Sequence, residues 1–165
     1  MWRSTVLVHA LFTGILAGPA VAQTPVIFGF TDSKIQLAVR RAVEGAAVRL
    51  ARPGCQEVLS DFTDQSGQRL SAKLQASGRS VAEAFGLLRF VDDRAALQCR
   101  RGPSAAFTLT GSRLIRVCGR QFRDRDQITT EIIVIHEFLH ALGLGENPPT
   151  SQAITEQVAV RCAAR

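Results

Sequence analysis

Five large apolar residues between Asp126 and Gly143 follow one another at steps of four and three, the spacing of one face of an α-helix. They are Ile128, Ile132, Ile135, Leu139 and Leu142. Asp126, or Asp124 two residues earlier, can cap the start of such a helix, and Gly143 can end it in the left-handed conformation. We therefore predict a long amphipathic helix that ends at Leu142 and buries one apolar stripe in the core.

The rest of the chain predicts further helices and short strands that cover this stripe. Helices are expected over 33–50 (capped by Asp32 or Ser33), 56–62, 68–75, from the capping box at 80–83, and over 151–163. Strands are expected over 26–30, 87–91, 105–110 and 114–118, the last two joined as a hairpin at Gly111-Ser112. The predicted fold class is α+β, one domain over 23–165 with a small antiparallel sheet stabilised by disulfides.

The N-terminus has the pattern of a signal peptide over residues 1–22. Arg3 precedes an uncharged, mainly apolar run that ends in Gly18-Pro19-Ala20-Val21-Ala22, and Ala-x-Ala favours cleavage after Ala22. An uncleaved membrane anchor is the alternative. The cleaved form predicts a secreted or periplasmic protein without a membrane segment.

Four cysteines follow the predicted cleavage site, and none belongs to a CxxC pair. Their even number and the predicted export favour two disulfides over a structural zinc site. The sequence leaves open all three pairings of Cys55, Cys99, Cys118 and Cys162.

Basic residues outnumber acidic ones by 20 to 14, and the stretch from 100 to 125 has seven arginines and one aspartate. Binding of phosphate or of an anionic polymer is one interpretation. A solvated outer strand and turn is the favoured one, because few aromatic residues lie between the arginines. We expect no nucleic-acid partner.

Residues 136–140 read His-Glu-Phe-Leu-His, inside the predicted long helix. A spacing of four places His136 and His140 on one face, one turn apart, which suits two zinc ligands. His9 lies in the predicted signal peptide, so these two are the only histidines of residues 23–165. Glu137 can accept a proton from a water molecule beside the metal. The pattern predicts zinc as cofactor and Glu137 as general base.

A catalytic zinc usually has a third protein ligand. Glu146 is the favoured candidate, because Gly143 can turn the chain back toward the histidines. Glu156 on the last helix is the second candidate, and water or an upstream acid is the third.

Residues 136–146 resemble the HExxHxxGxxH pattern of the metzincin zinc peptidases, with Glu146 in the place of the last histidine. The resemblance implies a zincin-like domain, zinc, and hydrolysis of peptide bonds with Glu137 as base. It also implies that an edge strand, taken as 114–118, pairs with extended substrate. Met1 is the only methionine, so the methionine turn of that family is missing. A later glutamate such as Glu156 is similar to the gluzincin arrangement. The run 135–149 also resembles small exported bacterial proteins.

The predicted function is an exported zinc metallopeptidase acting on a peptide or protein. Residues 23–165 contain no tyrosine and no further histidine to stabilise an oxyanion. That role falls to zinc, Arg113, Arg116, Arg120, Asn147, a hydroxyl side chain or a backbone N–H. The alternatives are a non-enzymatic zinc-containing binding protein and a zinc amidase acting on cell-wall material.

Overall fold

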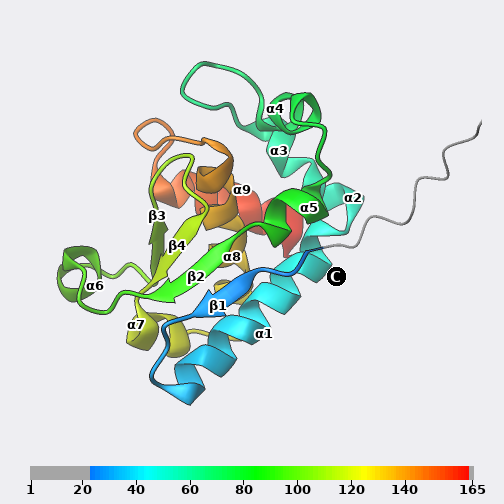
Figure 1. Ribbon diagram of the computed structural model, residues 1–165. Coiled ribbons are helices and arrows are strands. Elements are labelled where there is room, and N and C mark those ends of the chain that lie inside the picture. Colours follow the sequence, from blue (N-terminus) through cyan, green and yellow to red (C-terminus); the bar gives the residue numbers. More distant parts are fainter. Residues whose placement is uncertain (1–22, 164–165) are drawn as a thin grey trace, which may run out of the picture.

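A computed structural model describes residues 23–163, so the predicted signal peptide lies outside the described residues. The chain forms an α+β fold with one small sheet (Figure 1). Its elements are β1 (Val26–Phe28), α1 (Ser33–Leu50), α2 (Pro53–Gln56), α3 (Val58–Asp61), α4 (Leu70–Ala76), α5 (Val81–Gly86), β2 (Arg89–Asp92), α6 (Leu97–Arg101), β3 (Ala106–Thr108), β4 (Leu114–Val117), α7 (Gly119–Arg123), α8 (Gln127–Leu142) and α9 (Ser151–Cys162). No helix within 23–163 is long and apolar enough to cross a membrane.

The sheet is mixed, and the prediction of an antiparallel sheet is wrong for most of it. Its order is β1-β2-β4-β3, with β1, β2 and β4 parallel and only the β3–β4 hairpin antiparallel. The reason lies in the connections: helices return the chain between β1 and β2, whereas between β2 and β4 the antiparallel strand β3 returns it. Strand composition does not reveal this choice.

One face of the sheet packs on the helical layer and the other is partly solvated. Phe90 of β2 and its register partner Ile115 of β4 are fully buried, whereas Arg89 on β2 is exposed. On the helical side, α1 contacts α8, and both contribute fully buried side chains to the core. The apolar stripe predicted for α8 is confirmed at Ile132, Ile135 and Leu139, while Ile128 remains exposed.

The helix ends follow local capping chemistry. The Asp32 carboxylate accepts hydrogen bonds from the backbone N–H groups of Lys34 and Ile35, so Asp32 and not Ser33 caps α1. Asp126 rather than Asp124 caps α8 through the N–H of Thr129. These contacts place the first residue of each long helix.

Two disulfides join distant elements, as expected for a protein of an oxidising compartment. Cys55 on α2 pairs with Cys162 at the end of α9, and Cys99 on α6 pairs with Cys118, which precedes α7. The short helices α6 and α7 lie where the sequence pattern indicated no helix.

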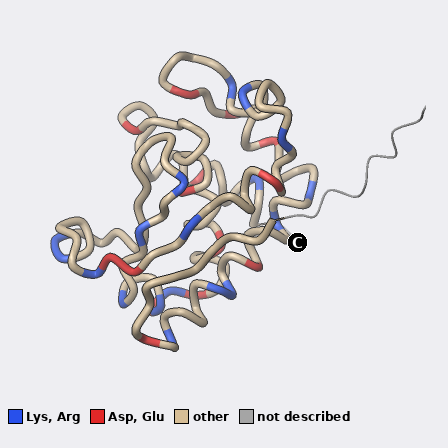
Figure 2. The backbone as a smooth tube through the Cα atoms, in the orientation of Figure 1, with Lys and Arg blue, Asp and Glu red and all other residues tan. Residues whose placement is uncertain are grey.

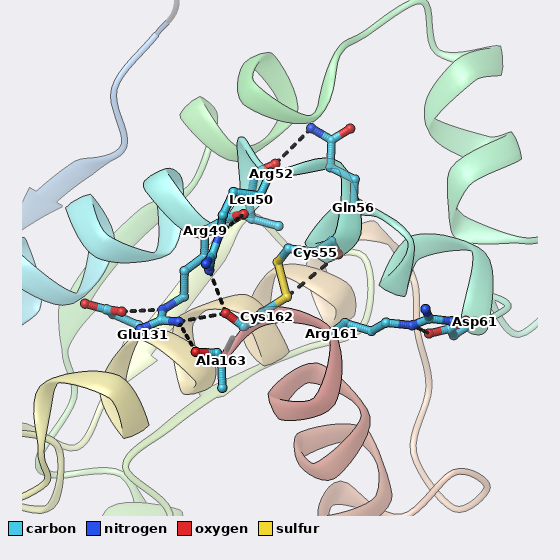
Figure 3. Close-up of a disulfide and its surroundings, with 10 residues drawn as sticks. All are labelled: Arg49, Leu50, Arg52, Cys55, Gln56, Asp61, Glu131, Arg161, Cys162 and Ala163. Atoms are coloured by element: carbon cyan, nitrogen blue, oxygen red, sulfur yellow. Dashed lines mark hydrogen bonds and ion pairs between the residues drawn. A yellow bond between two sulfur atoms is a disulfide. The ribbon is translucent and has the colours of Figure 1, made fainter. Parts of the chain in front are cut away.

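A partly buried ion pair joins α1 and α8, and hydrogen bonds connect it to the end of α9 (Figure 3). Arg49 contacts the carboxylate of Glu131 and donates hydrogen bonds to the carbonyls of Cys162 (2.7 Å) and Ala163 (3.2 Å). A Cβ at Gly45 would lie 2.0 Å from Glu131 Oε1, so the glycine leaves the space that this carboxylate fills. The arrangement fixes α8 and α9 relative to α1.

Candidate metal centre

The last two turns of α8 carry the HEFLH segment. His136 and His140 lie one turn apart, and each is only 5 % exposed. Helix α8 packs against α1, β3 and α9. The two imidazoles are therefore fixed on one face of a firmly packed helix.

The turn at Gly143 determines where the chain goes after the helix. Gly143 has φ +113°, and its N–H donates to the His140 carbonyl while the N–H of Leu144 donates to the Leu139 carbonyl. This pair of bonds is a Schellman motif, which satisfies two carbonyls at the helix end and reverses the chain. The predicted role of Gly143 is thereby confirmed, and the turn brings Glu146 back toward the histidines.

Three ligand atoms converge beyond this turn. His136 Nε2 lies 3.0 Å from His140 Nε2, and Glu146 Oε1 lies 3.2 Å from His140 Nε2 and 3.7 Å from His136 Nε2. The ligand atoms of these residues all lie within 4.8 Å of one another, so the group can hold a metal ion.

The other ring nitrogens have partners that leave Nε2 free for a metal. His140 Nδ1 lies 2.8 Å from the carbonyl of Leu144, which can only accept, so the proton of the neutral ring is assigned to Nδ1. His136 Nδ1 lies 2.9 Å from the hydroxyl of Thr155 on α9, which can accept in the same way. Such partners orient metal-binding imidazoles.

Burial and the neighbouring ring of His140 lower the pKa of His136 well below its ordinary value, although Glu146 opposes the shift. The His136 ring is therefore neutral near pH 7, the form in which an imidazole binds metal.

Glu137 is buried beside β3. Burial raises the pKa of its carboxyl to about 8, and the nearby hydroxyl of Thr108 opposes this only in part. Among the described residues, neither Glu137 Oε2 nor Thr108 Oγ1 has a hydrogen-bond partner of regular geometry. A buried acceptor without a partner is uncommon and marks a place that a ligand or water can fill.

A hollow of about 410 Å³ opens over the group. It is lined by both histidines, Glu137, Glu146 and the residues of strand β3. Several other polar residues also line it, including Gln98, Thr110 and Ser151. A second, more apolar hollow of about 350 Å³ shares His136 and Glu137 and extends along α8 past Ile133. Glu137 thus lines both hollows.

The strand at this cleft is not the one that was expected. The segment 114–118 contains β4, which lies between β2 and β3 and has no free edge. The edge strand beside the group is β3. The sequence could not distinguish the two strands, because the order in the sheet depends on long-range pairing.

Other candidate residues lie elsewhere. Glu156 is exposed, bonded to Gln152, and outside the group. Arg116 pairs with Asp93, while Arg113 and Arg120 line other hollows. The sequence did not predict that Thr155 and Thr108 lie at the site, because no regular spacing relates them to the HEFLH segment.

Comparison with protein-family models, with curated proteins and with solved structures finds no match for this chain.

Proposed function

We propose that this protein is an exported zinc-dependent metallopeptidase, with His136, His140 and Glu146 as zinc ligands and Glu137 as general base. The observation that carries the proposal is the convergence of three ligand atoms beside a buried carboxyl group whose Oε2 has no hydrogen-bond partner among the described residues. The HEFLH segment and its resemblance to the metzincin pattern support the same function.

Zinc is the metal that this donor set favours. Two imidazoles and one carboxylate are a common set in catalytic zinc sites, which keep a further position open. When bound, zinc would polarise a substrate carbonyl and acidify a water molecule.

Glu137 supplies the proton transfer. In its ionised form, which a zinc ion in the site would favour over the neutral form, Glu137 can accept a proton from water in the cleft through Oε2, an atom with no regular hydrogen-bond partner among the described residues. The same carboxyl can then pass the proton to the leaving amine.

An extended peptide is the substrate that the cleft suits best. Strand β3 borders the hollow and has one side without a neighbouring strand in the described sheet, so its backbone can pair with an added strand. Gln98, Ser104 and Ser151 are polar residues that line the hollow and are candidates to stabilise an oxyanion, in place of the arginines expected from the sequence.

The non-enzymatic alternative predicts a closed site with a fourth protein ligand. The described residues provide a group of three, and a hollow adjoins it. This arrangement favours a catalytic site. A zinc amidase would use the same chemistry and differs only in its substrate.

Zinc content and peptide cleavage, measured together, test the proposal. We expect the wild type to bind one zinc and cleave members of a mixed peptide library. Glu137→Gln should keep its zinc and lose activity by about 100-fold or more, because it removes the general base. Glu146→Ala should lose zinc, whereas Glu156→Ala should keep it. Full activity in Glu137→Gln, or unchanged zinc in Glu146→Ala, would refute the assigned roles.

A further inference from the structure

The carboxyl ends of the three parallel strands meet at one edge of the sheet. After β1 the chain passes through Thr31 and Asp32, after β2 through Arg94, and after β4 into α7. In Figure 1, α6 and α7 lie at this edge. Open parallel sheets bind ligands outside the carboxyl ends of their strands, where successive loops diverge and leave a crevice.

A hollow of about 460 Å³ lies at this edge, and none of its lining residues borders the metal cleft. Its volume is within the range of small-molecule sites. The lining combines the start of α1, the loop after β2, α6 and α7. It is therefore a second site, separate from the candidate metal centre.

Basic residues outnumber acidic ones in the lining. Four arginines line the hollow against one acidic residue, Asp32, and they are Arg94, Arg100, Arg120 and Arg123. Figure 2 shows basic segments on α6 and at the turn into α7. Two of the arginines are neutralised, because Arg94 pairs with Asp92 and Arg123 with Asp124.

The side chains of the other two arginines, Arg100 and Arg120, form no ion pair or hydrogen bond within residues 23–163, although both residues take part in backbone hydrogen bonds. The disulfide Cys99–Cys118 holds them at the same hollow, since Arg100 follows Cys99 and Arg120 is two residues after Cys118. Gln121 strengthens the junction by donating to the Cys99 carbonyl at 2.5 Å. Two unpaired guanidinium groups from distant segments are thus brought to one place.

We propose that this hollow binds a small molecule that carries a phosphate group. Guanidinium groups form paired hydrogen bonds with phosphate oxygens, and two of them match the charge of a phosphate monoester near pH 7. The hollow is large enough to hold an organic part of the ligand beside the phosphate group, and Ile35 provides an apolar residue in its lining. The proposal is independent of the proposed peptidase activity.

Calorimetric titration with inorganic pyrophosphate tests the site. The buffer contains a metal chelator, so that pyrophosphate cannot bind through a metal ion. We expect saturable binding to the wild type and a loss of affinity of about tenfold for each of Arg100→Ala and Arg120→Ala. Arg101→Ala is the matched control, because Arg101 lies on the same helix, is exposed, and does not line the hollow.

Backbone amide shifts in NMR spectra give the location of binding. We expect the largest changes over 99–100 and 119–123 and none over 136–146. Absence of saturable binding, an equal loss in Arg101→Ala, or shifts confined to the metal centre would each overturn the proposal. Thermal melting of the variants shows whether they remain folded, as expected for substitutions of exposed side chains.

Discussion

At the scale of single residues, the candidate metal centre depends on two atoms that hold its histidines. The carbonyl of Leu144 comes from the same turn that ends α8, whereas the hydroxyl of Thr155 comes from another helix. His136 therefore depends on the packing of α9 against α8, and His140 does not.

Replacement of Thr155 by valine removes the partner of His136 Nδ1 while keeping the volume of the side chain. We expect zinc affinity to fall by about tenfold or more, because the ring loses the hydrogen bond that fixes its orientation and its proton. Competition with a coloured chelator measures this affinity.

Glu156→Ala is the control for this change. Glu156 neighbours Thr155 on α9 but lies outside the metal group, so its replacement should leave zinc affinity unchanged. Equal affinities in Thr155→Val and the wild type would show that Thr155 does not position His136.

At the scale of elements, the Schellman turn after α8 determines the position of Glu146. A Cβ at Gly143 would lie 2.6 Å from Lys73 Nζ. The backbone of Gly143 is also in a left-handed conformation that other residues rarely adopt. The side chains of Asp64 and Lys73, which pair at 3.0 Å, lie against this turn. The segment 64–73 thus packs against the turn that precedes Glu146.

Gly143→Ala should lower the free energy of unfolding by about 1–2 kcal/mol and also weaken zinc binding, because alanine would strain the left-handed turn that presents Glu146. Urea denaturation and zinc titration measure the two effects. Gly67→Ala is the matched control: Gly67 has φ +82° and open space around its Cβ position, so it should lose stability alone. Normal zinc affinity in Gly143→Ala would contradict the role of the turn.

The sequence predicted those elements whose signals are local. The helices that begin after Asp32 and Asp126, and the end at Gly143, follow from capping chemistry and a regular apolar stripe. The helices α6 and α7 were missed, because four or five residues show no periodicity. The three candidate metal ligands could also be predicted, because they lie close together in the sequence. Thr155 and Thr108 lie near them only through tertiary packing.

At the scale of the whole molecule, the pairing of distant segments could not be predicted. The parallel alignment of β1, β2 and β4 and the choice among three cysteine pairings both depend on contacts between residues far apart in the chain. Local propensities are nearly the same for each alternative.

The two disulfides should differ in their contribution to stability. Cys55 and Cys162 are 107 residues apart, and Cys99 and Cys118 are 19 apart. The entropy of the unfolded chain predicts losses of about 5 and about 3 kcal/mol when each pair is replaced by serine. Urea denaturation of the two double variants measures the difference. A larger loss for the shorter loop would show that native contacts outweigh chain entropy here.

The three candidate ligands lie within eleven consecutive residues, from His136 to Glu146. A metal ion that joins them closes only a short loop, so the entropic cost is small even in a chain that is mostly unfolded. Helix α8 and its turn carry all three ligands, whereas the bond between Cys55 and Cys162 closes a far longer loop. If the group binds zinc as proposed, the ion would therefore stabilise mainly the end of α8 and its turn.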